Sequence, residues 1–375
     1  MISKAIRIAA FIVLQIIHKR LPVQKNKVLF LSDVRDSLDG NLKFVWNELS
    51  GEQWEKEVYC KDKQLHPQTV SDIREISRAI NTSEYIFLED VMPFLEFYTV
   101  KEGQEIIQLW HAAGAYKKFG FSRSEEGLRV SKSHNKYTKA ITSSAGINDC
   151  YAEAYGIDRA RITATGVPRT DIFFDEEWKL SVRNSLAENF PQIENKKVIL
   201  FAPTYRGTHI GDAGYNMDML PFDKLRDALG DEYIFITKWH PAMYNNLKST
   251  GQLDTDDDFV IDLSHIRDVN SIMPAADILV TDYSSIIFEW SLLDRPIVYY
   301  TYDIDEYSSG RGLYYPFEEY IYGNIAHNPE ELAEAIRSMR IDEKARSRFI
   351  AKFMDKCEGN ASRRVVELMK ESKTG

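Results

Sequence analysis

The sequence predicts an α/β fold with two Rossmann-like domains that face each other across a cleft. Short apolar runs that end in polar turn residues alternate with segments of helical periodicity, which is typical of a parallel sheet covered by helices. This alternation occurs twice, in stretches of similar size, and 375 residues is the length of two or three domains. We expect ligands to meet the carboxyl ends of the strands and the amino ends of the helices.

The elements of the first domain begin after Pro22. The expected strands are Lys27–Ser32, Tyr85–Leu88, Glu105–Leu109, Ala140–Ser143 and Arg161–Ala164, and the expected helices are Asn41–Leu49, Ser71–Ile80 and Gly146–Tyr155. The charged segment Phe174–Glu194 is expected to form a connection and one helix. In the second domain we expect strands at Lys197–Phe201, Tyr233–Thr237, Phe259–Asp262, Ile278–Thr281 and Pro296–Tyr300, and helices at Phe222–Leu229, Ser284–Leu293 and Glu330–Met339.

The composition, with 44% hydrophobic and 28% charged residues, is that of an ordinary globular protein and excludes disordered and fibrous classes. The net charge of −10 gives no overall electrostatic support to nucleic-acid binding. Cys60, Cys150 and Cys357 lie far apart and lack CxxC spacing. We therefore expect a reducing compartment, without a disulfide framework or a zinc site.

The N-terminus differs in charge from the rest of the chain. Residues 1–32 carry six basic side chains and no acidic one, whereas the other 343 residues carry a net charge of −16. The apolar stretch Ala5–Ile17 is too short to span a membrane, and His18-Lys19-Arg20 follows it instead of a cleavage site. We expect residues 1–22 to form a helix that lies in the interface of an anionic membrane. A helix packed on the body of the protein is the alternative.

The strongest local signal for ligand binding is DYSS at residues 282–285, between an apolar strand and a helix. Ser284 and Ser285 are expected at the helix N-cap, where backbone N–H groups and the helix dipole favour a phosphate or pyrophosphate. Simple capping of the helix is the alternative role of these serines.

Basic side chains follow two other strands of the second domain. Lys238 and His240, in KWHP, are expected near the cleft, where a histidine can donate to a phosphoryl oxygen. Arg206, in FAPTYRG, has the planar fork that suits phosphate or carboxylate. Taken alone, each motif is also compatible with an ordinary solvated loop.

In the first domain, His111 follows a strand within WHAAGAYKKFG, beside small residues that leave room for a substrate. It could act as a general base toward a hydroxyl, or be a buried structural histidine. Arg169 and Asp171, in GVPRTD, suit a structural corner as well as a binding site. We interpret DTDDD at 254–258 as a solvated acidic loop, and the sequence has no GxGxxG, Walker, GxSxG or HExxH motif.

The order of these motifs resembles that of a known family. From about Leu29 to Tyr315 the sequence reads WHxxGxxKxxG, GxPRxD, FAPTYRG, KWHP, TDYSSxxFEWxxLxRPIxYY and GxYY. This series resembles the CDP-glycerol glycerophosphotransferase family, the teichoic acid primases and polymerases of Gram-positive bacteria. Ala112 stands where the family often has glycine. That departure indicates a subgroup of the family. The GAYKKFGFSR continuation and the short chain resemble the primase type more than the polymerases.

The resemblance implies a glycosyltransferase-B-type fold and a reaction. The implied parts are an acceptor-side Rossmann-like domain at 23–175, a nucleotide-binding one at 176–340, and C-terminal helices at 341–375 that would cross back to the first domain. The implied reaction transfers glycerol phosphate from CDP-glycerol to a hydroxyl of a lipid-linked acceptor, expected to be an undecaprenyl-diphosphate disaccharide. It releases CMP and belongs to wall teichoic acid biosynthesis.

The family's chemistry maps onto the matching positions of this sequence. The implied catalytic residues are His111, as the base, and His240, as a phosphate contact. The expected substrate-binding residues are Arg206, Lys238, Ser284, Ser285, Asp282, Glu289, Arg169 and Lys117, with Glu289 placed at the cytidine ribose. The sequence requires no cofactor and predicts no metal ligands. It gives Mg²⁺ no support but does not exclude it, so metal dependence stays open.

Other functions remain open at this point. A CDP-ribitol-using or polymerising member of the family would carry the same motifs. A sugar-nucleotide glycosyltransferase or epimerase would keep the fold, and a non-catalytic membrane scaffold would use only the N-terminus. We expect a peripheral protein on the cytoplasmic face of the membrane, without a nucleic-acid partner, and the sequence does not indicate an oligomeric state.

Overall fold

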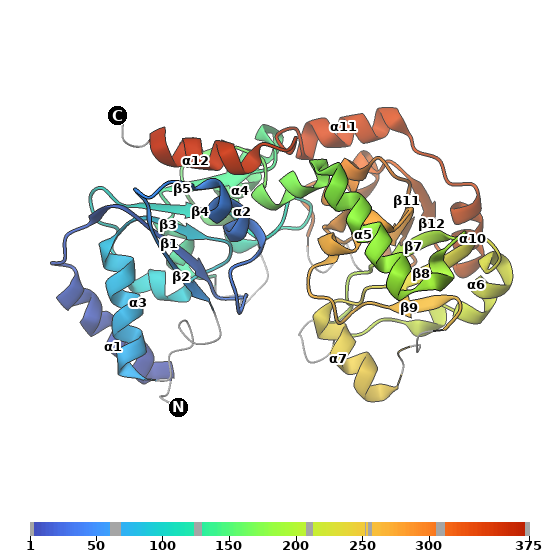
Figure 1. Ribbon diagram of the computed structural model, residues 1–375, viewed down its shortest axis with the longest axis horizontal. Helices are drawn as coiled ribbons and strands as arrows, with labels where there is room; N and C mark the ends of the chain where they lie inside the picture. The colour runs from blue at the N-terminus through green and yellow to red at the C-terminus, as the bar shows by residue number, and fades with distance from the viewer. Residues whose placement is uncertain are drawn as a thin grey trace. The chain divides into compact units, whose positions relative to one another are not determined.

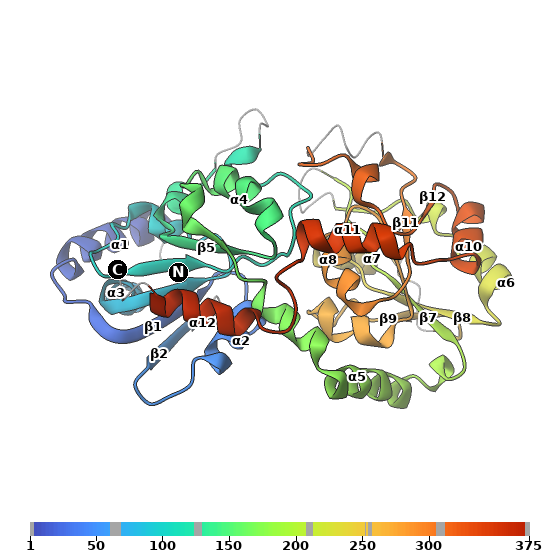
Figure 2. The same ribbon diagram turned by 90° about the horizontal axis from the view of Figure 1, so that it is seen from above.

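The computed structural model describes residues 4–60, 69–123, 130–207, 213–251, 253, 257–304 and 312–371. The chain folds into two compact units. Unit 1 comprises residues 1–171 together with 351–375, and unit 2 comprises residues 172–350. Figures 1 and 2 show the strands of each unit side by side, with helices packed around them.

Unit 1 contains a parallel six-stranded sheet in the order β2-β1-β3-β4-β5-β6. The strands are β1 (Gln24–Ser32), β2 (Glu55–Cys60), β3 (Ser83–Leu88), β4 (Glu105–Gln108), β5 (Lys139–Thr142) and β6 (Ile162–Ala164). The helices are α1 (Lys4–His18), α2 (Gly40–Glu48), α3 (Val70–Thr82), α4 (Asn148–Tyr155) and α12 (Ala361–Glu371). The apolar run VLFL at residues 28–31 of β1 is buried, as expected for a parallel sheet that helices cover on both faces.

Unit 2 repeats this architecture, with the strand order β12-β11-β10-β7-β8-β9. The strands are β7 (Lys197–Phe201), β8 (Tyr233–Thr237), β9 (Val260–Asp262), β10 (Ile278–Thr281), β11 (Ile297–Tyr300) and β12 (Asn324–Ala326). The helices are α5 (Glu176–Asn189), α6 (Phe222–Leu229), α7 (Pro241–Thr250), α8 (Ile286–Trp290), α10 (Pro329–Arg337) and α11 (Glu343–Phe353). The predicted α/β class with two Rossmann-like sheets is confirmed.

Every predicted strand is present, with ends that differ from the prediction by at most three residues. β2 and β12 were not predicted, and both are edge strands with polar, partly exposed residues. α7 was also not predicted, because its first turn contains Pro241, and proline is tolerated there although it is typical of loops. The predicted helix Ser284–Leu293 is shorter than expected, since α8 ends at Trp290 and residues 291–293 form a 3₁₀ turn.

The C-terminal segment belongs to the core of unit 1. Val365 and Met369 of α12 are fully buried in that core. Both oxygens of Asp171 accept backbone N–H groups at the start of α12, each at 2.8 Å, so this residue of GVPRTD is a helix cap. The Ser143 hydroxyl donates to the Phe353 carbonyl at 2.6 Å, which fixes the end of α11 in the same unit.

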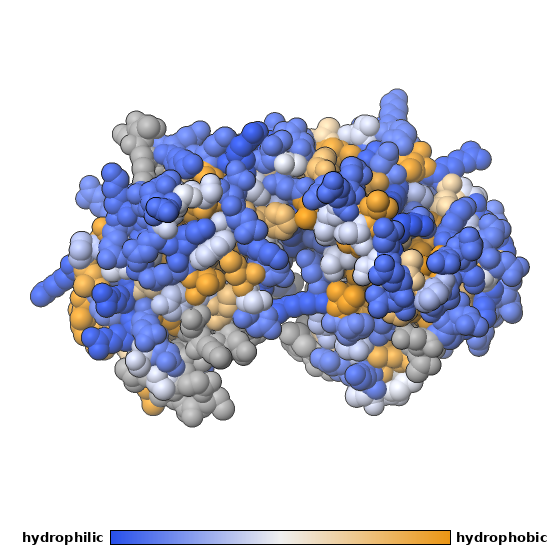
Figure 3. Space-filling model, in the orientation of Figure 1, coloured by the Kyte–Doolittle hydropathy of each residue, from blue (hydrophilic) through white to orange (hydrophobic). Residues whose placement is uncertain are grey.

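Helix α1 packs against α3 through one face only. Phe11 is buried against Phe94, with ring centroids 4.9 Å apart, and Gln15 and His18 form hydrogen bonds with the Ser77 hydroxyl. The other face exposes a row of apolar side chains: Ile6, Ile12, Val13, Ile16 and Ile17. Figure 3 shows hydrophobic residues at the edge of unit 1 where Figure 1 places α1. Among the described residues, no helix combines the length and apolarity needed to traverse a bilayer.

Candidate active site

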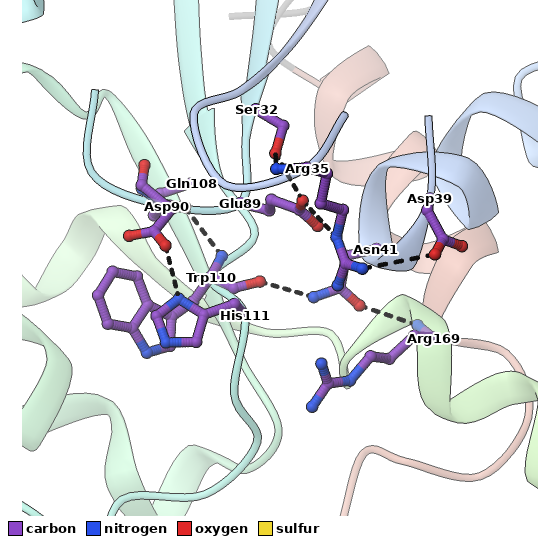
Figure 4. Close-up of polar contacts among 10 residues, drawn as sticks. All are labelled: Ser32, Arg35, Asp39, Asn41, Glu89, Asp90, Gln108, Trp110, His111 and Arg169. Carbon is purple, nitrogen blue, oxygen red and sulfur yellow. Dashed lines mark hydrogen bonds and ion pairs between the residues drawn. The ribbon is translucent and has the colours of Figure 1, made fainter. Parts of the chain in front are cut away.

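His111 and Asp90 face each other at the carboxyl edge of the unit 1 sheet (Figure 4). They follow the neighbouring parallel strands β4 and β3, and Nδ1 of His111 lies 3.4 Å from Oδ2 of Asp90. Burial raises the pKa of Asp90, but hydrogen bonding and charge attraction from His111, with the Val91 N–H, lower it overall. The His111 side chain is 43% exposed, so it is accessible to a substrate and is not the buried structural histidine of the alternative hypothesis.

The turn that carries His111 has an unusual backbone conformation. Trp110 adopts a positive φ of 58°, which is uncommon for a residue with a side chain. The Trp110 N–H donates to Gln108 Oε1 at 2.9 Å, and its carbonyl accepts from Asn41 Nδ2 at 2.6 Å. The other end of the buried Asn41 amide accepts from the Arg169 N–H at 2.9 Å. Asn41 therefore joins the His111 turn to the GVPRTD loop.

A second carboxylate, Glu89, precedes Asp90 but serves a different network. Its Oε1 accepts from the Ser32 hydroxyl at 2.8 Å and from Arg35 Nε at 2.6 Å. Burial raises the pKa of Glu89, and the Arg35 charge opposes that effect. Gly40, with a φ of 57°, leaves the space that the Arg35 guanidinium fills, because a Cβ there would collide with it. This ion pair joins the segment after β1 to the end of β3, next to Asp90.

Two expected substrate-binding residues, Arg169 and Lys117, also lie in unit 1. Figure 4 shows the Arg169 side chain extending from its loop in the direction of His111. Lys117 is half-buried in the segment that follows His111. Unit 1 thus brings Arg169 near the predicted base, through Asn41.

In unit 2, Arg206 is enclosed by carboxylates and aromatic rings. Its Nη1 lies 2.8 Å from Asp282, and its Nε and Nη2 lie 2.5 and 2.9 Å from Asp303. Three rings surround the guanidinium, with centroids 5.4–5.7 Å away: Tyr215, Tyr283 and Tyr302. Burial lowers the pKa of Arg206, but the two carboxylates raise it overall. Arg206 and Asp282 were both expected to bind substrate, but in the structure they bind each other.

His240 caps the amino end of α7. Its Nδ1 accepts the Ala242 N–H at 3.2 Å, and its ring lies 5.0 Å from that of Tyr205. Because Nδ1 acts as an acceptor, the neutral ring carries its proton on Nε2, which can donate to an anion. Lys238 is buried instead, its Nζ lies 3.4 Å from the Ser264 carbonyl, and burial lowers its pKa.

The predicted serine cap is only partly present. Helix α8 begins at Ile286, and the Ser285 side chain makes no capping hydrogen bond. The Ser284 hydroxyl accepts from the Ile286 N–H at 3.5 Å, which is long for a hydrogen bond. Glu289, expected at the ribose, is buried within this five-residue helix. Arg206, His240 and Ser284 nevertheless follow the adjacent strands β7, β8 and β10, so they share one edge of the unit 2 sheet.

Several residues of these networks were not predicted from the sequence, among them Asp90, Asn41 and Asp303. For Asp90 a signal was available, since a pair of carboxylates directly after a buried strand marks the functional edge of a parallel sheet. Asn41 and Asp303 bind partners 69 and 97 residues away, and nothing local identifies them.

No cluster of three His, Cys, Asp or Glu residues suited to a metal ion occurs in the part of the chain that the structure describes. Residues 254–256 of the acidic stretch lie outside it. Asp257 forms an ion pair with Arg226 at 2.5 Å.

Two parallel Rossmann-like sheets with polar side chains at the carboxyl ends of their strands define a protein of the glycosyltransferase-B type. Within this class, the chain matches the model of the CDP-Glycerol:Poly(glycerophosphate) glycerophosphotransferase family over residues 13–371, and it belongs to that family. The family predicted from the motif series is confirmed.

Three relatives illustrate the similarity. The chain is 37% identical to the teichoic acid poly(ribitol-phosphate) polymerase of Bacillus spizizenii over 94% of its own length and 57% of the polymerase. It is 32% identical to the teichoic acid ribitol-phosphate primase of the same species, over 93% of this chain and 92% of the primase. It is 33% identical to the teichoic acid glycerol-phosphate primase of Bacillus subtilis, over 70% of this chain and 65% of the primase.

Solved structures support the fold. The wall teichoic acid polymerase TagF superposes with a TM-score of 0.76 at 22% identity, covering 98% of this chain and 93% of that one. The UDP-GlcNAc 2-epimerase of Neisseria meningitidis superposes with a TM-score of 0.56 at 13% identity, covering 92% and 100%.

Proposed function

We propose that the protein transfers an alditol phosphate from a CDP-alditol to a hydroxyl group of a lipid-linked acceptor, with release of CMP, in wall teichoic acid biosynthesis. The observation that carries this proposal is the accessible His111, paired with Asp90 at a strand end, in a chain of the glycerophosphotransferase family. The acceptor that we propose is a polyprenyl-diphosphate disaccharide.

The proposed reaction begins at His111. Its Nε2 removes the proton from the acceptor hydroxyl, and the hydroxyl oxygen attacks the phosphorus atom that carries the alditol. The bond between this phosphorus and the bridging oxygen breaks, and CMP leaves with the electron pair. We propose that the Nε2–H of His240 and the hydroxyls of Ser284 and Ser285 donate to the developing charge.

Three residues that were expected to bind substrate are largely enclosed at the carboxyl edge of the unit 2 sheet: Lys238, Glu289 and Arg206. Lys238 and Glu289 are 7% and 2% exposed, too enclosed to meet a ligand in this conformation. Because the Arg206 guanidinium is directed at Asp282 and Asp303, we assign it to holding the segments after β7, β10 and β11 together. This assignment replaces the expected phosphate contact for Arg206.

The donor is the finer question within this proposal. The motif series led us to expect CDP-glycerol. The two ribitol-phosphate relatives, however, align with 93–94% of this chain, whereas the glycerol-phosphate primase aligns with 70% of it. We therefore propose CDP-ribitol as the preferred donor and CDP-glycerol as the second candidate.

Release of CMP tests the proposed function. Purified protein is incubated with a synthetic lipid-linked disaccharide and either CDP-ribitol or CDP-glycerol, and CMP and lipid products are quantified. We expect acceptor-dependent CMP release, faster with CDP-ribitol, and the product length shows whether one unit or many are added. Absence of CMP with both donors, or turnover of a UDP-sugar instead, would refute the proposal.

We also propose that α1 attaches the protein to the cytoplasmic face of the membrane. Its exposed apolar row would enter the lipid, and Lys19 and Arg20 at its end are exposed and can meet lipid phosphates. Each such cation contributes about 1 kcal/mol near an anionic surface. The face packed on α3 stays with the protein, so the two alternatives for this helix are compatible.

Vesicle sedimentation tests this attachment. Ile16 is 69% exposed, and Ile16→Asp should abolish binding to phosphatidylglycerol vesicles while the fold is retained. The matched control is Leu180→Asp, at a side chain of α5 that is 60% exposed, which should bind like the wild type. Equal binding by both variants would show that α1 is not the anchor.

A further inference from the structure

We propose that Asp90 is a positioning residue that holds His111 in the tautomer with its proton on Nδ1, so that Nε2 can accept a proton. The effect of Asp90 on the reaction rate rests on the proposed function. Its effect on the imidazole does not, because the tautomer exists in the protein without any substrate.

The sheet places the two residues together. β3 and β4 are paired in parallel with Leu88 opposite Gln108, so the residues that follow the two strands emerge side by side. The Asp90 carboxylate is fixed at its other oxygen, because Oδ1 accepts the Val91 N–H at 2.6 Å. Oδ2 is then directed at His111 Nδ1, at 3.4 Å.

The pairing determines which ring nitrogen carries the proton. An ionised carboxylate can only accept hydrogen bonds, so the nitrogen that faces it must be the donor. The pKa of Asp90 is lowered overall, which keeps this carboxylate ionised at neutral pH. A separation of 3.4 Å is long, and such contacts commonly shorten when the substrate binds.

The imidazole has a second restraint. Its ring lies 4.3 Å from that of Trp110, between centroids, and the Trp110 backbone is fixed by Gln108 and Asn41. The neighbouring Glu89 is engaged by Ser32 and Arg35. Of the two consecutive carboxylates, Asp90 is therefore the one that faces the base.

This arrangement has a chemical consequence. With Nδ1–H directed at Asp90, the lone pair of Nε2 is available for the hydroxyl proton. After proton transfer, the imidazolium lies beside a negative charge that stabilises it. Removing that charge while keeping the shape should slow proton transfer, and in a protease triad the same Asp→Asn change lowers the rate about 10⁴-fold.

Nitrogen NMR of histidine-labelled, substrate-free protein above neutral pH tests the proposal directly. His111→Gln identifies the His111 signals. We expect the Nδ1–H tautomer in the wild type and its loss in Asp90→Asn, where the amide can donate to Nδ1. Asp149→Asn, at an exposed carboxylate that pairs with Arg159, is the matched control and should leave the signals unchanged.

Rate measurements complete the test. Asp90→Asn should lower kcat for CMP release by about 10²–10⁴-fold without changing donor affinity, whereas Asp149→Asn should behave like the wild type. An Nε2–H tautomer in the wild type, or an Asp90→Asn rate equal to that of the control, would overturn the proposal. If the wild type releases no CMP at all, the proposed function fails, and the tautomer of the wild type still decides the role of Asp90.

Discussion

Replacing Arg206 by methionine should destabilise unit 2 strongly. Its guanidinium lies within 2.5–2.9 Å of two carboxylates, and the side chains of Arg206, Asp282 and Asp303 are 20%, 1% and 14% exposed. Methionine preserves much of the volume but leaves two enclosed negative charges without their cation. Breaking a buried pair from one side costs about 3–5 kcal/mol, and we expect the free energy of unfolding to fall by that amount.

Urea unfolding, followed by circular dichroism and tryptophan fluorescence, measures this effect. The matched control is Arg226→Met, because Arg226 forms an ion pair with Asp257 in which both side chains are more than one third exposed. Loss of such a surface pair costs about 0–1 kcal/mol. The midpoint of Arg206→Met should therefore lie well below that of Arg226→Met.

Donor affinity distinguishes the two roles of Arg206. If Arg206→Met unfolds like the control but no longer binds the CDP-alditol, the residue is a phosphate ligand, as its motif suggested, and the positioning role is wrong. Asp303→Asn provides a second comparison. It should destabilise less, because the ion pair between Arg206 and Asp282 remains.

Three further changes test other parts of the structure. Burial lowers the pKa of His134 to about 4, from 6.5. As the pH falls from 6.5 to 4, His134 therefore gains a proton only in the unfolded chain, and the free energy of unfolding decreases by about 3 kcal/mol. His134→Phe should reduce this decrease, which urea titrations at several pH values measure. Asn41→Leu leaves the Trp110 carbonyl and the Arg169 N–H without their partner, so the free energy of unfolding should fall by about 1–3 kcal/mol per group. The variant should also release CMP more slowly; calorimetry measures the first effect and the CMP assay the second. Gly166→Ala places a Cβ against the Lys356 carbonyl at a φ of 84°, and it should expose the C-terminal segment to limited proteolysis, whereas Gly103→Ala, at an open position, should not.

The fold could be predicted from the sequence because most of its strands are buried apolar runs. β7, β8 and β10 have the predicted ends, since each is an apolar segment bounded by polar turns. β2 and β12 lack that signature because polar residues interrupt or begin them and most of their side chains are at least partly exposed. α7 was not predicted because Pro241 is compatible with a turn as well as with the first turn of a helix.

The site was predictable to the extent that it depends on strand ends. His111 and His240 lie at the ends of their strands, as their motifs indicated. What surrounds a side chain depends on contacts between distant segments, and a single sequence does not reveal them. The sequence indicated that Arg206 binds an anionic group, but the groups it binds are the carboxylates of Asp282 and Asp303, 76 and 97 residues away.

Rapid-quench measurement of CMP release by His111→Ala, with donor affinity determined in parallel, examines the proposed chemistry at its first step. We predict a rate that is about 10²–10⁴-fold lower than that of the wild type, with unchanged binding of the CDP-alditol, because the variant loses only the proton acceptor. A rate close to that of the wild type would contradict the assignment of His111 as the base.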